Sequence, residues 1–467
     1  MISIDKLKTA DIQLTVEMAE NDDSTAWHLA LEAAVMEPCS LEDLRLTCRG
    51  RILPEGMRAQ VWSRFLGISS TSCELEHFKE IFDLHNQSVL HEDCKSVVEN
   101  LGNDEEDKVA IMSDIESIVT FFCKSHGKSY TPNNGWLEIL MPLFPLKLPR
   151  NELYALFNTI LDNYIPRHCC PNGAAIHLFR LLLLYHEPEL CSFLDSHKIT
   201  ADLYTLKWFS TLFAGACNVP ACVALWDYYF VHSDPFLIFF LALVLLLNAK
   251  DELMTLKGDK QKILVTIDSL PKQMDAADVP DFCSLAVLYA AQTPVSYKRA
   301  YHQVLFGEEH HVELLESPTS KLLSQALCLS VSVNELLVSC GLISNSVNSE
   351  QENSSLRFFL VDCRPAEQYN AGHLPTAFHL DSNLMLTEPQ AFSVAVQALL
   401  SAQKQSIAAH SAAGGEHLAF FGSGREAEDQ YVHMVVAFFL QRHVQFVSLV
   451  QGGFQDVHEA LILANCD

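Results

Sequence analysis

Two short stretches of this chain hold side chains that could do chemistry. The first is Asp362-Cys363-Arg364, which directly follows the apolar run 358–361. Such a run is typical of a buried parallel strand, and open α/β sheets place their reacting groups at the carboxyl ends of these strands. Because cysteine reacts only as its thiolate, we predict that Cys363, directly after a buried strand, is a structural thiol. We expect Asp362 and Arg364 to pair with each other or to cap the ends of loops.

The second stretch is the loop 422–429, Gly-Ser-Gly-Arg-Glu-Ala-Glu-Asp. Ser423 could act as a nucleophile only with an activating base, and His417 and His433 are the histidines nearest to it in the sequence. Three acidic side chains would repel thiosulfate or phosphate, because like charges repel each other: Glu426, Glu428 and Asp429. The loop is therefore expected to be a poor site for an anionic substrate.

The elements around these residues follow the order of a parallel sheet. Residues 365–369 start a short helix with proline at its first position, residues 372–375 (Gly-His-Leu-Pro) break the chain, and residues 377–380 begin a second strand. Further strands are expected at 416–421 and at 447–451, before a Gly-Gly-Phe turn. This order resembles the rhodanese domain, whose first strand runs into Asp-x-Arg and is followed by a short helix and Gly-His-Ile/Leu.

The rhodanese resemblance implies the fold without its chemistry. In that family a loop cysteine carries sulfur as a thiolate, stabilised by backbone amides that point at it. Here the cysteine position falls on Gly422, and no cysteine lies between Cys363 and Cys466. The same absence excludes a Cys-x5-Arg phosphatase. A sulfurtransferase or phosphatase is therefore the third and least favoured function class.

The composition favours a folded protein with several domains. Its 467 residues allow about two or three domains, and 49% apolar residues are enough for large cores. The formal net charge of −27 argues against nucleic acid and anionic lipid as partners. The 15 cysteines are scattered without a Cys-x-x-Cys motif, and residues 1–14 show no secretory signal. We therefore expect reduced thiols in the cytoplasm, no zinc site and no cofactor.

The region 70–325 has apolar residues spaced close to 3.6 almost everywhere, which predicts an all-helical domain. Its longest apolar run, 236–247, has 12 residues, whereas a bilayer span needs about 20. We expect this run to be a buried core helix, with Asp234 as its N-cap before a proline. Ahead of the region, Ser40 is expected to cap a helix by accepting a hydrogen bond from the third helical amide.

Two segments of the helical part resemble the TBC domain of Rab GTPase-activating proteins. Residues 53–67 are similar to the family's opening motif, and residues 206–247 reproduce its Trp-x-x-x-x-Phe and Trp-Asp spacing at Trp208 and Trp226. The expected fold class is therefore multi-domain, with an all-α TBC (Rab-GAP-like) domain followed by an α/β rhodanese-like domain with a parallel sheet. The expected boundaries are a polar leader at 1–24, the TBC domain at 25–310, a linker at 311–325 and the rhodanese-like domain at 326–467.

The TBC resemblance implies hydrolysis of GTP on a bound Rab through an arginine finger and a glutamine finger. The arginine position of Ile-x-x-Asp-x-x-Arg falls on Ser96, and the glutamine position of Tyr-x-Gln falls on Pro132. An arginine finger contributes about 10³ to 10⁵ in rate. Lys95 is turned about 100° from Ser96 on a helix and should not replace the finger. We therefore expect no enzyme activity.

Two partner-binding folds without their catalytic residues indicate binding rather than turnover. The resemblance implies a non-catalytic adaptor that tethers endosome-derived vesicles, peripheral at the trans-Golgi network in the cytoplasm. Its implied partners are golgins and, without catalysis, Rab GTPases. The WASH complex would be bound only through a further C-terminal region that we expect to be absent from this sequence. A residual Rab GTPase-activating protein is the alternative.

A cluster of arginines is the partner-binding site that we expect in the helical domain. Residues 45–64 hold five arginines with only Glu55 opposing them. Guanidinium groups bind carboxylates through two parallel hydrogen bonds, so the segment suits an acidic partner peptide. One member, Arg58, lies in the TBC opening motif and has a structural ion pair as its alternative role. The cluster comprises Arg45, Arg49, Arg51, Arg58 and Arg64.

Overall fold

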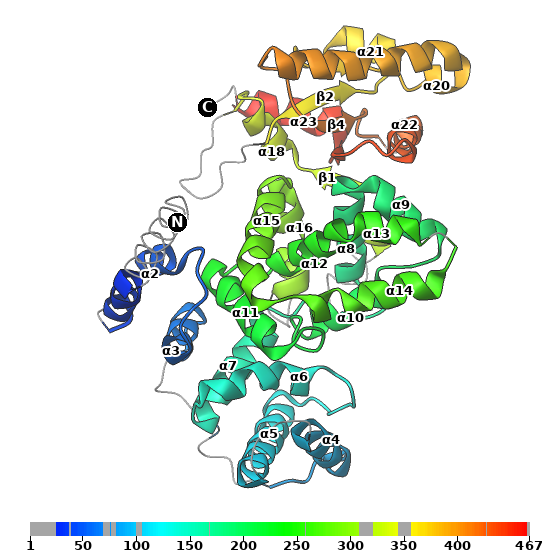
Figure 1. Ribbon diagram of the computed structural model, residues 1–467. Helices are drawn as coiled ribbons and strands as arrows, with labels where there is room; N and C mark the ends of the chain where they lie inside the picture. The colour runs from blue at the N-terminus through cyan, green and yellow to red at the C-terminus, as the bar shows by residue number, and fades with distance from the viewer. Residues whose placement is uncertain are drawn as a thin grey trace, which may run out of the picture. The chain divides into compact units, whose positions relative to one another are not determined.

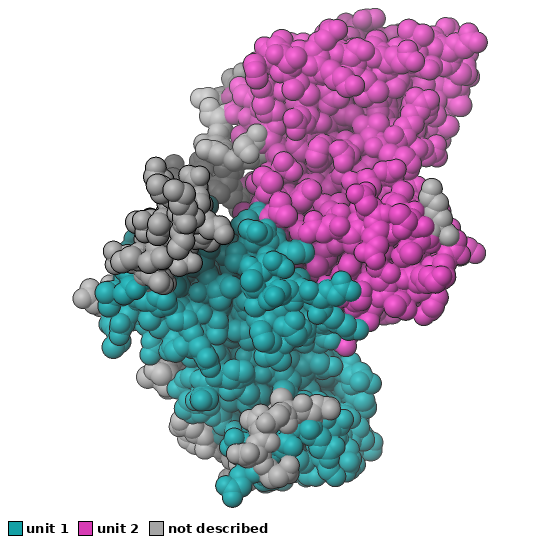
Figure 2. All heavy atoms as spheres, viewed as in Figure 1, with its two compact units in different colours: residues 1–165, 210–235, 271–284 teal, residues 166–209, 236–270, 285–467 magenta. Residues whose placement is uncertain are grey.

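The computed structural model describes residues 25–36, 39–68, 75, 81–99, 105–167, 169–256, 258–307, 321–343, 356–425 and 427–464. The expected leader and most of the expected linker lie outside these ranges, and residues 321–325 are helical. Two compact units can be distinguished (Figure 2): residues 1–165, 210–235 and 271–284 form the first, and residues 166–209, 236–270 and 285–467 form the second. The helical region contributes to both units, and the described residues between 25 and 307 form no strand.

The first unit is a set of helices around buried aromatic side chains. It contains α2 (Leu41–Cys48), α3 (Glu55–Phe65), α4 (Gln87–Glu99), α5 (Glu105–His126), α6 (Trp136–Leu140), η2 (Met141–Leu146), α7 (Arg150–Asn163), α11 (Val219–His232) and η4 (Ala276–Asp278). Ser40 caps α2 as predicted, because its side chain accepts from the amide of Asp43. The ring of Trp62 packs on Trp226 and Phe230, with centroids 5.9 and 5.1 Å away. These contacts hold α3 against α11.

The helices of the second unit include one that is apolar on every side. They are α8 (Ala174–His186), α9 (Pro188–Ser196), α10 (Asp202–Ser210), α12 (Leu237–Asn248), α13 (Lys250–Thr255), α14 (Lys260–Ser269) and α16 (Val295–Phe306), while α15 (Val279–Ala291) is shared between the units. Residues 237–246 of α12 are all buried, as expected of a helix without a polar face. None of the helices in the described ranges has the length and apolarity needed to cross a membrane.

The prediction that Asp234 caps α12 is wrong. Phe236 is the N-cap, without a side-chain hydrogen bond. Pro235 lies in a turn before the helix, and its carbonyl accepts a 2.6 Å hydrogen bond from the hydroxyl of Tyr229. The helix therefore begins at Leu237, two residues later than it would with Pro235 at its first position.

The α/β domain has a parallel sheet, as predicted. The strands β1 (Leu329–Val331), β2 (Phe358–Asp362), β3 (Phe378–His379), β4 (His417–Phe421) and β5 (Val447–Val450) lie in the order β1-β5-β4-β2-β3. All pairings are parallel. The covering helices are α18 (Val333–Ser339), α19 (Ala366–Ala371), α20 (Leu384–Thr387), α21 (Pro389–Ala408), α22 (Gln430–Gln441) and α23 (Gly453–Ala464).

The central strand β2 is buried on both faces of the sheet. Phe359 and Val361 belong to a core with residues of α21 and α22, whereas Phe358 and Leu360 belong to a core with residues of α18 and α23. Figure 1 shows α21 lying along one side of the sheet. Burial on both faces explains why the strand reads as a continuous apolar run. The short helix α19 begins at Ala366, with Pro365 as its N-cap rather than its first residue.

Buried polar contacts join the sheet domain to helices α8 and α16 within the second unit. Glu335 of α18 accepts from the amides of Val295 and Ser296, each at 2.7 Å, and also from the hydroxyl of Ser296. It therefore caps the start of α16. The hydroxyl of Tyr185 shares a 2.6 Å hydrogen bond with Nδ1 of His417, and both side chains are buried. The two parts of this unit are thus coupled through groups that have no access to water.

Candidate functional site

Ser96, at the expected arginine-finger position, lines a cavity that is also bordered by Tyr130 and Asn133, on either side of Pro132. The hydroxyl of Tyr130 donates to Asp93 at 2.7 Å, and the side-chain amide of Asn86 donates to the Tyr130 carbonyl at 3.0 Å. These bonds tie the loop that contains Pro132 to α4, which carries Ser96. The cavity has a volume of about 190 Å³ and is lined by Asp93, Ser96, Val97, Tyr130, Asn133, Asn134, Leu137, Glu138 and Met141.

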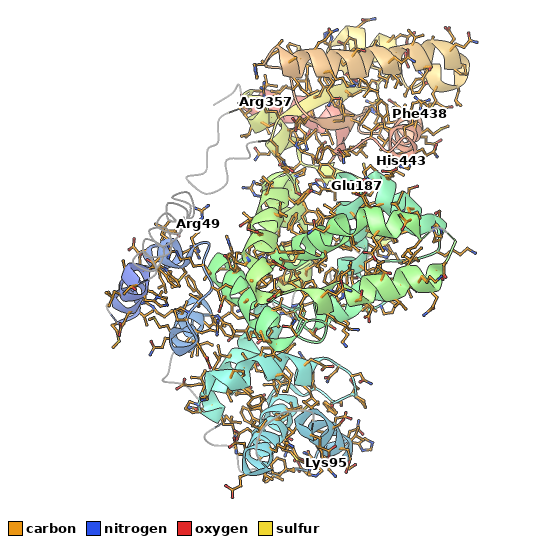
Figure 3. The ribbon with its side chains drawn as sticks, viewed as in Figure 1. Arg49, Lys95, Glu187, Arg357, Phe438 and His443 are labelled. Atoms are coloured by element: carbon orange, nitrogen blue, oxygen red, sulfur yellow. The ribbon has the colours of Figure 1, made fainter. Side chains whose placement is uncertain are left out.

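The charge of this cavity is unsuited to a phosphoryl group. Its charged lining residues are two carboxylates, Asp93 and Glu138. Lys95, labelled in Figure 3, is exposed on α4 and is not among the lining residues. Burial, together with the hydrogen bond to Asp93, raises the pKa of the Tyr130 hydroxyl and keeps it neutral. Phosphoryl transfer develops negative charge that cations or aligned donors must stabilise, and these lining residues include no cation.

Two asparagines of this cavity were missed by reasoning from the sequence. Asn133 has a φ of 58°, in the left-handed region that asparagine tolerates. The side-chain oxygen of Asn134 accepts from the amide of Trp136 at 3.1 Å. Its side-chain nitrogen is buried and has no hydrogen-bond partner among the described residues. The Pro-Asn-Asn-Gly run is a turn signal, but nothing in that signal indicates that the turn borders a cavity.

The loop after β4 is closed on an internal carboxylate. Asp429 accepts hydrogen bonds from the amide of Ser423 at 2.7 Å, from the hydroxyl of Ser423 at 3.0 Å and from the amide of Gly424 at 2.8 Å. The carbonyl of Gly422 accepts from the amide of Phe454 at 2.8 Å, which fixes the loop against the start of α23. The amides that would stabilise a thiolate or an oxyanion therefore point at Asp429.

At position 422, where the rhodanese resemblance places the nucleophile, the space for a side chain is taken by Asp429. A Cβ atom built on Gly422 would lie 2.2 Å from Oδ1 of Asp429. The acidic residues of the loop therefore act differently from one another. Glu428 bonds to Arg425 and Gln368 at the surface, whereas Asp429 fills the loop itself, and Glu426 lies outside the described residues.

The Asp362-Cys363-Arg364 stretch has the structural role that we predicted. The guanidinium of Arg364 donates to both carboxylate oxygens of Asp362, at 2.9 and 2.6 Å, and to the carbonyl of Gly372 at 2.7 Å. It also lies over the ring of Phe454, 3.5 Å from the ring centroid. Cys363 is fully buried, and burial raises the pKa of its thiol well above the ordinary value. The thiol therefore stays protonated and unreactive.

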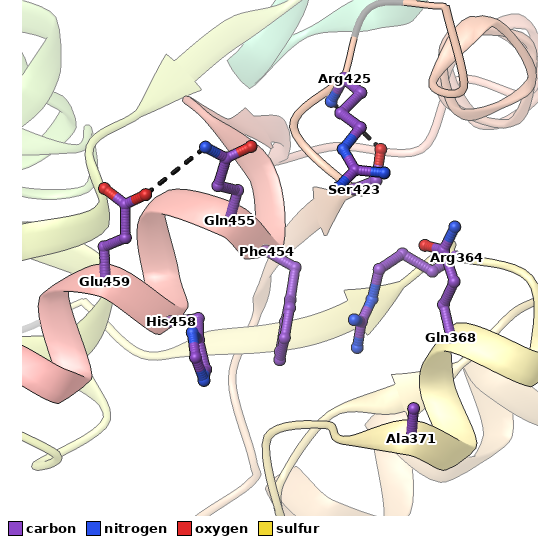
Figure 4. A pocket seen from close by; sticks show the side chains of 9 residues that line it. All are labelled: Arg364, Gln368, Ala371, Ser423, Arg425, Phe454, Gln455, His458 and Glu459. Carbon is purple, nitrogen blue, oxygen red and sulfur yellow. Dashed lines mark hydrogen bonds between the residues drawn. The ribbon is translucent and has the colours of Figure 1, made fainter.

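A second cavity, of about 490 Å³, opens beside the loop (Figure 4). Its one hydroxyl is that of Ser423, which donates to Asp429 and has no hydrogen bond to a histidine in the described part of the chain. His417 is turned toward Tyr185, and burial lowers its pKa to about 4. His433 is exposed on α22. Neither of these two histidines is therefore placed to act as a base for Ser423. The cavity is lined by Arg364, Gln368, Ala371, Ser423, Arg425, Phe454, Gln455, His458 and Glu459.

Comparison with known proteins agrees with both halves of this architecture. Residues 55–254 match the Rab-GTPase-TBC domain family, and residues 345–460 match the rhodanese-like domain family. The chain carries a TBC domain followed by a rhodanese-like domain. The match to the TBC family includes α4 and the loop with Pro132, and the match to the rhodanese family includes the loop filled by Asp429.

Similar proteins include members of one group of small G protein modulators. A Small G protein signaling modulator 3 homolog of Xenopus laevis is 29% identical over 156 residues, covering 32% of this chain and 20% of the relative. Small G protein signaling modulator 3 of Mus musculus is 29% identical over 245 residues, covering 49% of this chain and 31% of the relative. The chain therefore spans less than a third of the length of these relatives.

Two solved structures of Rab-GAP domains are also similar. The Ypt/Rab-GAP domain of Gyp1p is 15% identical with a TM-score of 0.44, covering 54% of this chain and 94% of that domain. A Chlamydomonas flagellar RabGAP TBC domain is 16% identical with a TM-score of 0.44, covering 59% of this chain and 94% of that domain.

Arg58 of the TBC domain forms a structural ion pair, the role that the sequence indicated as the alternative to partner binding. It donates to the carboxylate of Asp227 at 2.8 and 2.9 Å and to the carbonyl of Leu53 at 2.7 Å. Asp227 also accepts from the indole of Trp62 at 2.9 Å and from the amide of Leu53 at 3.1 Å. Burial raises the pKa of Asp227, against the opposing effect of Arg58. Arg58 is therefore engaged in holding α3 on α11 and is unsuited to contact a partner.

The other arginines of the expected cluster are engaged to different degrees. Arg64 donates to the carbonyls of Ala34 and Cys39 at 2.8 and 2.7 Å, which secures the chain before α2. Three further members remain: Arg45 donates to the carbonyl of Val231 and to Glu42, Arg51 lies 5.1 Å from the Trp27 ring centroid, and Arg49 is exposed directly after α2. Figure 3 labels Arg49. Partner binding by this segment stays a prediction, centred now on Arg49.

Proposed function

We propose that this chain is a non-catalytic adaptor that tethers endosome-derived vesicles at the trans-Golgi network. A TBC domain implies interaction with Rab GTPases, and the relatives are named as modulators of small G protein signaling. The tethering role comes from the resemblance to TBC1 domain family member 23, a vesicle-tethering adaptor. On this proposal the chain acts in the cytoplasm, peripheral to Golgi and vesicle membranes, and binds golgins.

One observation carries the proposal: each expected catalytic centre holds carboxylates where its chemistry needs groups that stabilise anions. Asp93 and Glu138 line the cavity together with Ser96. In the loop after Gly422, Asp429 accepts the hydrogen bonds of the backbone amides. Catalysis of phosphoryl or sulfur transfer depends on donors and cations aimed at developing negative charge. The chain has both folds, but neither expected centre has the donors and cations that catalysis needs. This combination supports a role in binding partners rather than in catalysis.

Single-turnover GTP hydrolysis across a panel of Rab GTPases tests the proposal. A TBC domain that retains both fingers serves as the positive control. We expect acceleration of less than twofold by this chain, because an arginine finger alone contributes about 10³ to 10⁵ and Ser96 supplies no cation. Acceleration of tenfold or more on any Rab would contradict the proposal.

A residual Rab GTPase-activating protein is the second candidate. The observation in its favour is that Ser96 and the loop with Pro132 still border one cavity, tied together by the Tyr130–Asp93 hydrogen bond. Lys95 is the cation nearest to the arginine position in the sequence. If acceleration is seen, loss of it in Lys95→Ala but not in Lys404→Ala, which changes another exposed helical lysine, would assign the activity to this site.

A further inference from the structure

Asp429 stands where an anion would sit in the loop after β4. Both of its carboxylate oxygens are used: Oδ1 accepts from the amide and hydroxyl of Ser423, at 2.7 and 3.0 Å, and Oδ2 accepts from the amide of Gly424 at 2.8 Å. Successive amides that converge in this way form an anion-binding nest. Asp429 also directly precedes α22, so its charge lies at the positive end of that helix dipole.

The frame of this nest is held by bonds that do not involve the carboxylate. The amides of Phe454 and Gln455, in the first turn of α23, donate to the carbonyls of Gly422 and Ser423 at 2.8 and 3.1 Å. A Cβ atom at Gly424 would lie 2.2 Å from the carbonyl oxygen of Gly452, so the backbones of the two turns are in close contact. We therefore expect these contacts, and the direction of the amides, to persist when the Asp429 side chain is removed.

We infer that Asp429 is a built-in anion, which fills the nest and excludes small tetrahedral oxyanions such as sulfate, thiosulfate or inorganic phosphate. An intramolecular carboxylate competes at a high effective concentration with any anion from solution. Ser423 lines the open cavity of about 490 Å³ beside the nest, which gives a solvent anion a route to the amides. We expect removal of the carboxylate to free the amides of Ser423 and Gly424 for a small oxyanion, with Glu428 still present at the surface of the loop.

Sulfate binding by the full chain tests this inference. Asp429→Ala removes the carboxylate, and Glu428→Ala is the matched control, because Glu428 is the neighbouring acid and its carboxylate accepts hydrogen bonds at the surface, from Arg425 and Gln368. Isothermal titration with sodium sulfate, against sodium chloride at equal ionic strength, gives the affinity. We expect sulfate to bind Asp429→Ala at least tenfold more tightly than the unaltered chain, and Glu428→Ala to behave as the unaltered chain does.

Thermal unfolding gives an independent measure on the same proteins. We expect Asp429→Ala to unfold at a lower temperature in chloride and to regain most of the loss in sulfate, because a ligand that binds only the folded state stabilises it. Asp429→Asn, which keeps the shape of the side chain, should show the same response more weakly and serves if the alanine variant fails to fold. The inference would be overturned if sulfate bound the unaltered chain as tightly as it binds either variant. It would also be overturned if neither Asp429→Ala nor Asp429→Asn showed an effect specific to sulfate. Neither result depends on whether the chain accelerates GTP hydrolysis.

Discussion

At position 422, the absence of a cysteine is linked to the carboxylate of Asp429, which lies next to it. A Cβ atom at Gly422 would meet Oδ1 of Asp429 at 2.2 Å, so the loop cannot hold a cysteine and this aspartate in their present positions. A thiolate beside a carboxylate would also have a raised pKa, because like charges disfavour the charged form. The two residues therefore have to be changed together before the loop can regain sulfur chemistry.

We predict that Gly422→Cys alone gives a thiol of low reactivity and no thiosulfate turnover. Gly422→Cys combined with Asp429→Ala should alkylate with iodoacetamide about tenfold faster at neutral pH, since one pKa unit changes the thiolate fraction about tenfold. The site of alkylation is read by peptide mass spectrometry, with Asp429→Ala alone as the control for the other thiols. Equal alkylation rates in the single and double variants would contradict the coupling, and robust thiosulfate turnover by the unaltered chain would contradict the absence of sulfur chemistry.

Residue roles were predictable where the partners are close in the sequence. The pairing of Asp362 with Arg364 follows from their spacing of two residues. The assignment of the finger positions to Ser96 and Pro132 rests on local motifs and stays a prediction. Arg58 could not be assigned in this way, because its partner Asp227 is 169 residues away. The inward turn of Asp429 was equally hidden, since an acidic residue in a polar loop is more often a solvated charge.

At the scale of elements, the end of α8 and the start of β4 bring two buried histidines together with Tyr185. Burial lowers the pKa of His186 to about 3 and that of His417 to about 4, from an ordinary value of 6.5 for each. Unfolding releases both side chains to water, so the unfolded chain binds protons below pH 6.5 that the folded chain does not take up until pH 4 or lower. The free energy of unfolding therefore falls as the pH falls through this window.

We predict that the second unit loses stability between pH 6.5 and pH 4, by up to about 1.4 kcal/mol per pH unit for each of the two histidines. Urea unfolding of the full chain at pH 7.5, 6.0 and 5.0 measures the loss. His417→Gln removes one titrating group and should give a shallower pH dependence, whereas His433→Gln, at an exposed position on α22, should not change it. A slope that is equal in both variants and in the unaltered chain would show that these buried histidines do not control the acid response.

Elements with a long apolar signal were predicted, and those fixed by tertiary contacts were not. The core helix α12 and the strands β2 and β4 are rich in consecutive apolar residues because they are buried on all sides, and such runs are visible in the sequence. The three-residue strand β1 is too short to show a period and exists through its pairing with β5. The start of α12 was misplaced because the hydroxyl of Tyr229 donates to the carbonyl of Pro235, six residues further along the chain, and the apolar pattern gives no sign of this bond.

At the scale of the whole molecule, the net charge of −27 decides where an acidic partner can approach. With 31 basic against 58 acidic residues, most of the surface repels an acidic peptide, which suppresses wrong contacts and favours the few basic positions. Among the arginines of residues 45–64, Arg58 and Arg64 hold the fold together through Asp227 and the chain before α2. Arg49 is the exposed member, so a test at this residue separates partner binding from folding.

On the proposed adaptor function, we predict that Arg49→Glu lowers the affinity for an acidic golgin peptide at least fivefold and leaves thermal unfolding unchanged, because an exposed guanidinium can pair directly with a partner carboxylate. Lys95→Glu is the matched control, since it makes the same change in net charge at an exposed position on α4 and should leave binding unchanged. Arg58→Glu should instead lower the unfolding temperature, because it leaves Asp227 buried without its cation. Fluorescence anisotropy of labelled peptide measures the affinity. If Arg49→Glu binds within about twofold, or roughly 0.4 kcal/mol, the golgin site lies elsewhere, and the cavity beside Phe454 becomes the next surface to mutate.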